Sequence, residues 1–130
     1  MAVDIQRARE FLRRRQARQQ ALLSERFAEA WRDCRAIVKL IAEKYKPRRI
    51  HQWGSLLNRE HFCVASDIDL AVEGITEPAR FFALYGEADR LTGFPLDLVE
   101  MEKIEPEFAE LIREHGIVVY ERDDASGGAA

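Results

Sequence analysis

Residues 66–74 read SDIDLAVEG, and this stretch decides the fold. Two acids, Asp67 and Asp69, alternate with apolar residues, which is the two-residue period of a β-strand. Gly74 closes the strand. Side chains two residues apart project from the same face, so these carboxylates lie about 6–7 Å apart along the chain. The pattern predicts a strand that carries a pair of acids on one face.

The paired acids indicate a cation site. Adjacent carboxylates repel each other, which costs stability unless a cation lies between them. Hard, charged oxygen ligands suit Mg²⁺. A third acid, Asp97, interrupts the apolar run FPLDLV at residues 94–99, where an acid is unusual. If the two strands are neighbours, Asp97 joins Asp67 and Asp69 in one cluster.

A glycine and a serine, Gly54 and Ser55, lie 13 and 12 positions before Asp67. Glycine lets backbone N–H groups approach a phosphate closely, and a helix beginning there favours an anion. The Ser55 hydroxyl could donate to a phosphate oxygen, although serine at this position is more often a helix N-cap. The pair alone is a weak signal, and its combination with the three acids is a much stronger one.

The rest of the chain supplies helices and further strands around these motifs. We expect an α/β (α+β) fold: a small mixed sheet of about four strands with packed helices and a long helical N-terminus. The third helix should direct Phe108, Leu111 and Ile112 inward. The expected elements are a helical region over 4–46 with a joint near 22–25, strands at 49–53, 66–73, 94–101 and 117–120, a helical turn over 55–60, and helices over 77–91 and 105–115.

Composition narrows the functional classes. A chain of 130 residues fits one domain, and its net charge of −3 argues against a general nucleic-acid binder. No apolar run is long enough to span a membrane. The two cysteines, Cys34 and Cys63, are too few and too far apart for a disulfide scaffold or a zinc site. A cytoplasmic protein is the expectation.

The N-terminal segment differs from the remainder. We expect a helical extension over 1–26, a main domain over 27–122 that carries the acids and the glycine-serine pair, and a disordered tail over 123–130. The extension has a short apolar stripe and six arginines, at positions 7, 9, 13, 14, 15 and 18. An isolated helix of this length is marginal in water, so it needs another surface. It is expected to serve self-association or partner docking, as a homo-oligomer or with a partner.

These motifs together resemble the polymerase-β-type nucleotidyltransferases. The match rests on Gly54-Ser55, on the strand of residues 66–72 and on LDLV at 96–99, within a similarity that covers about 37–121. The most similar group is the minimal nucleotidyltransferases, many of which are antitoxins encoded beside a HEPN-domain toxin.

The resemblance implies a reaction and a set of roles. Asp67 and Asp69 would ligate two Mg²⁺ ions, and Asp97 would ligate one of them or take the proton of the attacking hydroxyl. Nucleotide-binding residues would be Gly54, Ser55, Arg59 and Ser66. A nucleoside monophosphate, expected to be AMP from ATP, would pass to an acceptor hydroxyl with loss of pyrophosphate. The family often continues Gly-Ser with Arg-x-Arg-Gly, and this chain retains only Arg59 nearby.

Several alternatives stay open. The acids could be solvated residues on an exposed sheet face, and Asp97 could pair with an arginine. The acceptor could be a HEPN-type toxin, which fits a domain with little room for its own acceptor site. It could instead be a small hydroxylated molecule such as an antibiotic. A third possibility is an antitoxin that acts by binding alone, with an idle metal site.

Overall fold

A computed structural model of the chain describes residues 4–123 and contains a four-stranded mixed sheet, as the sequence predicted. The strand order is β3-β2-β1-β4, in which β1 is antiparallel to β2 and β4, and β2 is parallel to β3. The elements in chain order are α1 (Ile5–Leu40), the π-helical turn η1 (Ile41–Tyr45), β1 (Arg49–Trp53), the 3-10 turn η2 (Ser55–Leu57), β2 (Ile68–Glu73), α2 (Pro78–Asp89), β3 (Leu96–Glu100), α3 (Pro106–His115) and β4 (Ile117–Glu121).

The N-terminal helix is unbroken, so the joint expected near residues 22–25 is wrong. Asp4 caps it by accepting a hydrogen bond from the Arg7 backbone N–H at 3.0 Å. No glycine or proline interrupts Ile5–Leu40, and its many arginine, glutamine and alanine residues favour a helix strongly. The lack of an apolar stripe over residues 13–20 therefore removes packing from this part of α1 without ending the helix.

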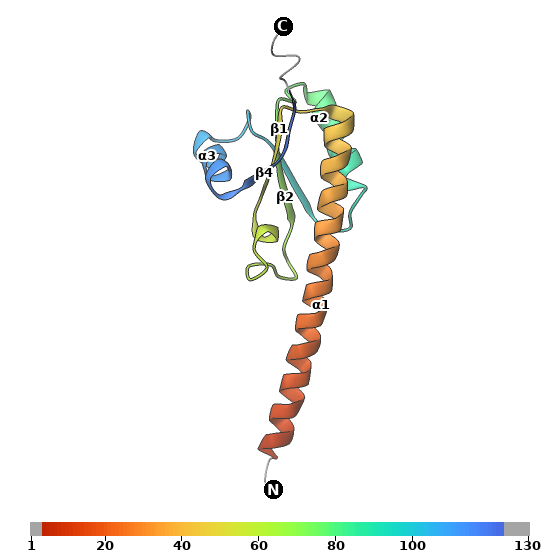
Figure 1. Cartoon of the computed structure of the whole chain (residues 1–130), viewed down its shortest axis with the longest axis vertical. Coiled ribbons are helices and arrows are strands. Elements are labelled where there is room, and N and C mark those ends of the chain that lie inside the picture. Colours follow the sequence, from red (N-terminus) through yellow and green to blue (C-terminus); the bar gives the residue numbers. More distant parts are fainter. Residues whose placement is uncertain (1–3, 124–130) are drawn as a thin grey trace.

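The helices cover the two faces of the sheet unequally (Figure 1). α1 and α2 lie on one face, where the main core gathers Ile37 and Ile41 against Ile50 and Leu70. α3 lies on the other face over a smaller cluster that includes Ala71 and Ile112. β2 lies between β1 and β3 and is buried on both faces, so residues placed on it are well fixed.

The orientation of α3 differs in part from the expectation. Ile112 is buried as predicted, together with Ala109. Leu111 is 54% exposed and Phe108 37%, so the prediction that they point inward is wrong for Leu111 and only partly right for Phe108. A ten-residue helix on a four-stranded sheet needs only a narrow apolar stripe, and here that stripe runs through Ala109 and Ile112.

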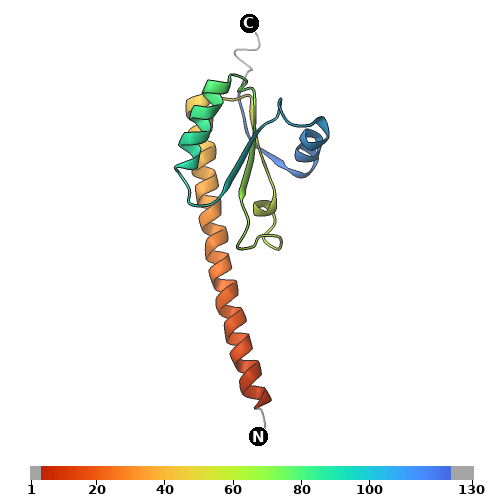
Figure 2. The ribbon, with the colours of Figure 1, turned by 180° about the vertical axis from the view of Figure 1, so that it is seen from behind.

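The first half of α1 extends past the sheet, as two opposite views show (Figures 1 and 2). Every residue from Asp4 to Leu22 is exposed. The expected tail lies, apart from Asp123, outside the described residues. None of the described helices is long and apolar enough to cross a membrane.

Candidate active site

The three acids predicted from the sequence come together at the start of β2. β2 and β3 run parallel with Asp69 directly beside Asp97. Strand alternation then places both side chains on the face that carries α3. Asp67 immediately precedes β2, and its charge acts on both of the other carboxylates. The solvated-acid alternative therefore does not hold for Asp69, which is 8% exposed.

The cluster concentrates negative charge in a partly dry place. Burial raises the pKa of Asp69 to about 7, and repulsion from Asp97 and then Asp67 adds to the effect. The pKa of Asp97 is also raised, first by desolvation and then by Asp67. No arginine or lysine in residues 4–123 forms an ion pair with any of the three acids. The arrangement favours an external cation.

The donor set fits a hard divalent ion, because it offers only carboxylate oxygens and repels itself without a counter-charge. Within residues 4–123, however, no three His, Cys, Asp or Glu side chains are already arranged as a metal site. Asp97 is exposed and Asp67 half-buried, so these two have room to change rotamer. Asp69 is the fixed member of the set.

Both the backbone conformation at residue 54 and the close packing around it require a glycine. Its φ is +86°, which L side chains rarely adopt. A Cβ at this position would overlap the Asp69 carboxylate. The turn after β1 therefore packs directly against Asp69, the most buried of the three acids. This contact places the backbone of Gly54 and Ser55 beside the cluster.

A hydrogen-bond network closes the loop between the two motifs. The Ser55 hydroxyl donates to Ser66 Oγ at 2.8 Å, and the Cys63 backbone N–H donates to the same oxygen at 2.9 Å. Ser66 directly precedes Asp67, so this contact joins the glycine-serine turn to the acids. Ser55 begins η2, and Gly54 occupies the N-cap position without a side-chain cap bond.

Arg59 lies away from this group. Its Nη2 donates to Ser24 Oγ on α1 at 3.1 Å, and its guanidinium lies over the Phe27 ring at 5.6 Å. The sequence-based assignment of Arg59 to the nucleotide stays a prediction. The other predicted residues, Gly54, Ser55, Ser66 and the acids, are brought together.

Trp53 also lies beside the acids, although the sequence did not single it out. It pairs with Asp69 in the β1–β2 register, and its ring packs edge-on against Phe108 at 5.2 Å. The indole Nε1 is buried and has no hydrogen-bond partner. Its position just before Gly54 was visible in the sequence, but its place beside the acids depends on strand register.

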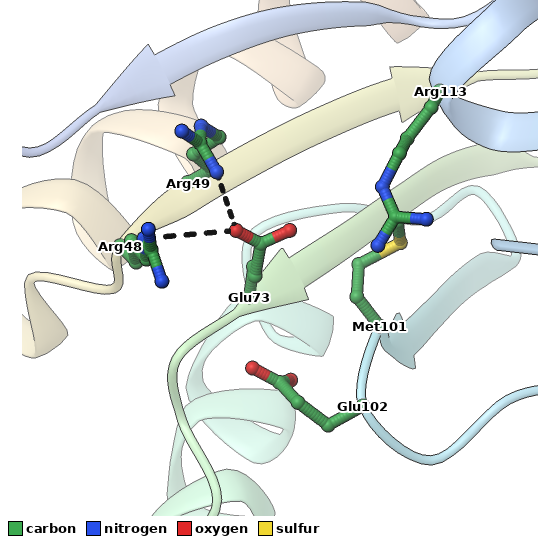
Figure 3. Close-up of a pocket in the computed structure, with 6 residues that line it drawn as sticks. All are labelled: Arg48, Arg49, Glu73, Met101, Glu102 and Arg113. Carbon is green, nitrogen blue, oxygen red and sulfur yellow. Dashed lines mark hydrogen bonds and ion pairs between the residues drawn. The ribbon is translucent and has the colours of Figure 1, made fainter. Parts of the chain in front are cut away.

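The opposite end of the same sheet face holds a polar hollow of about 330 Å³ (Figure 3). Glu73 lies between Arg48 and Arg49, and Arg49 also binds Glu121, at 2.7 Å to each carboxylate. His51 is buried beside Glu73, and this burial lowers the pKa of the imidazole. The ion pairs of Arg49 link β1 to β2 and β4. Glu73 therefore has arginine partners, in contrast to Asp67, Asp69 and Asp97.

A sequence model described as "Polymerase beta, Nucleotidyltransferase" matches residues 35–125. The chain belongs to this nucleotidyltransferase family. No curated protein sequence matches it. The matched region begins within α1 and leaves the projecting half of that helix outside the family domain.

Solved structures with the same fold include toxin–antitoxin proteins. A toxin–antitoxin crystal structure with AMP-PNP has a TM-score of 0.58 at 18% identity, covering 72% of this chain and 77% of that one. The tri-AMPylated Shewanella oneidensis HEPN toxin in complex with its MNT antitoxin gives 0.54 at 17%, covering 75% and 77%. A toxin–antitoxin MntA–HepT structure gives 0.52 at 17%, covering 73% and 75%. At these identities the likeness shows the nucleotidyltransferase fold.

Proposed function

We propose that this nucleotidyltransferase moves AMP from ATP onto a hydroxyl of a HEPN-type toxin and thereby acts as its antitoxin in the cytoplasm. The observation that carries the proposal is the convergence of Asp67, Asp69 and Asp97 beside the Gly54–Ser55 turn. An uncompensated acid cluster next to a phosphate-accessible turn suits binding of a metal–triphosphate complex.

The three acids would hold Mg²⁺. When bound, Mg²⁺ neutralises phosphate charge and lowers the pKa of an attacking hydroxyl. Asp69, held by β2 and the Gly54 backbone, fixes the position of the cluster. Asp97 is exposed on β3, where an acceptor hydroxyl can reach it, and its raised pKa suits a group that accepts a proton.

The turn would hold the triphosphate. Gly54 has no side chain that would keep a phosphate away from its backbone. The Ser55 hydroxyl, which here donates a hydrogen bond to Ser66, can donate to a phosphate oxygen instead. The catalytic demand is mainly positioning and charge neutralisation, which such a small set of residues can meet.

A protein acceptor is supported by the size of the domain and by its neighbours. The sheet and its helices leave no separate acceptor domain within residues 4–123. One structural neighbour holds AMP-PNP, and another is a complex whose HEPN toxin is tri-AMPylated. A partner that brings its own hydroxyl to the open side of Asp97 fits both facts.

The test is transfer of label from α-labelled ATP, with Mg²⁺, to the HEPN-type protein encoded nearest to this chain. We expect label on that protein, lost with Asp69→Asn and retained with Asp89→Asn, an exposed acid at the end of α2. Toxin neutralisation without label would favour an antitoxin that acts by binding alone. Label on an added aminoglycoside and not on protein would favour the small-molecule reaction.

A further inference from the structure

The projecting half of α1 lacks a surface of its own. It is exposed from Asp4 to Leu22, and in both views it continues beyond the sheet (Figures 1 and 2). At about 1.5 Å per residue, this overhang is nearly 30 Å long. A helix of this length gains little from propensity alone, so a second surface would stabilise it.

One side of the overhang combines charge with apolar side chains. Positions separated by three, four or seven residues share a helix face. Phe11 and Leu22 on this side are each 61% exposed. We call this side the basic stripe; it consists of Arg7, Phe11, Arg14, Arg15, Arg18 and Leu22. Arg9 and Arg13 lie on the opposite side.

The outer side of α3 shows the complementary pattern. Its inner side buries Ala109 and Ile112 against the sheet. Its outer side has Leu111, 54% exposed, among three carboxylates, and the group lines a hollow of about 330 Å³. We call this side the acidic face; it consists of Glu107, Glu110, Leu111 and Glu114. In both helices an exposed apolar side chain is flanked by charges at helical spacing.

These two surfaces cannot meet within one molecule. α1 and α3 cover opposite faces of the sheet, and the overhang points away from α3 (Figures 1 and 2). We propose that two copies of the chain exchange helices, so that the basic stripe of each lies on the acidic face of the other. A reciprocal exchange uses the same contact twice and closes as a two-fold dimer, the commonest form of homo-oligomer.

The proposed contact has a defined balance of forces. Phe11 against Leu111 supplies a small apolar centre, and the arginine–glutamate pairs around it supply orientation. Rim charges of this kind are screened by salt, because the Debye length falls from about 10 Å at 0.1 M to about 3 Å at 1 M. The dimer should therefore dissociate as salt is raised, and its formation does not depend on the transfer reaction.

Sedimentation velocity of the full chain at low and high salt measures the assembly. We expect a dimer at low salt that Arg14→Glu/Arg18→Glu weakens at least about tenfold in dissociation constant, because like charges then face each other. The matched control is Arg9→Glu/Arg13→Glu on the opposite side of the helix, which should assemble as the wild type does. Far-UV circular dichroism checks that both double variants keep their helix content.

A charge-swap experiment identifies the partner surface. Glu110→Arg/Glu114→Arg alone should also weaken the dimer, and mixing it with Arg14→Glu/Arg18→Glu should restore a one-to-one dimer through one charge-swapped contact and one wild-type contact. Restoration would exclude general misfolding of either variant. A monomer at all concentrations would overturn the proposal. So would a dimer that depends on the basic stripe but ignores the acidic face, which would assign the overhang to another partner.

Discussion

Replacing Asp69 with asparagine should stabilise the protein without metal while abolishing transfer. Asp69 is 8% exposed, and burial with two neighbouring acids raises its pKa from 3.8 to about 7. A shift of this size corresponds to about 4 kcal/mol between the protonated and ionised carboxyl, at about 1.4 kcal/mol per pKa unit. Asparagine keeps the size of the side chain and removes this cost.

The raised pKa of Asp69 determines how the folding stability of the wild type changes with pH. The folded-state pKa is raised, so the contribution of protonated Asp69 is fully present below pH 3.8 and is lost as pH rises toward about 7. The advantage of Asp69→Asn over the wild type should therefore grow by about 2–3 kcal/mol between pH 5 and pH 8. The growth with pH separates this effect from any constant change in packing.

Urea unfolding at pH 5 and pH 8, in EDTA, measures that advantage. Asp89→Asn is the control, and an exposed substitution of this kind should change stability by less than about 0.5 kcal/mol. Adding Mg²⁺ with ATP should raise wild-type stability by about 2.7 kcal/mol at 100 times the dissociation constant, and the variant by much less. If Asp69→Asn were no more stable at pH 8 than at pH 5 relative to the wild type, the buried-acid argument would be refuted.

Three further predictions concern the turn, the thiols and the overhang. Gly54→Ala should lower stability by roughly 1–3 kcal/mol and weaken ATP binding, because φ at this residue is positive and the new Cβ would overlap Asp69. Thermal melting measures the stability and calorimetry measures the ATP affinity. Normal ATP affinity would count against a phosphate-binding role for the turn. Iodoacetamide at pH 8 should modify the exposed Cys63, because a hydrogen bond from Ser66 lowers the pKa of its thiol. It should spare Cys34, because burial raises the pKa of that thiol to about 12. Mass spectrometry measures the labelling of both thiols, and labelling of Cys34 before Cys63 would contradict the prediction. Deleting residues 1–20 should leave ATP binding intact and weaken assembly in light scattering, whereas loss of ATP binding with unchanged assembly would assign the segment to the site.

The strands that carry the acids were predictable because their alternation is strong. Asp67 and Asp69 interrupt an apolar strand at the two-residue period, and Asp97 does the same in its own strand, so their secondary structure followed from local pattern. Their convergence was conditional on β2 and β3 being neighbours, which no local pattern states. The long-range pairing of Asp69 with Asp97 came from the structure.

Other features depend on contacts between distant segments and could not be predicted. The close contact of Gly54 with Asp69 depends on the β1–β2 register. The Ser55–Ser66 hydrogen bond depends on the path of the loop between these two strands. Arg59 was assigned by its nearness in sequence, but its guanidinium lies on α1 against Phe27. The continuity of α1 was missed because weak amphipathicity was interpreted as a break, although no residue there ends a helix.

Register on β3 is what turns three acids into one cluster. A slip of one residue would move Asp97 to the face covered by α1 and α2 and would bring its neighbours out of the core. Leu96 and Leu98 are 8% and 5% exposed in the observed register, whereas Asp97 is exposed. The slipped strand would lose the burial of two leucines, at about 1.5–3 kcal/mol each, and would place an unpaired carboxylate in an apolar layer. The same leucines that complete the core therefore fix the side on which Asp97 meets Asp69, and hydrophobic patterning alone keeps a mutually repelling site assembled before any cation binds.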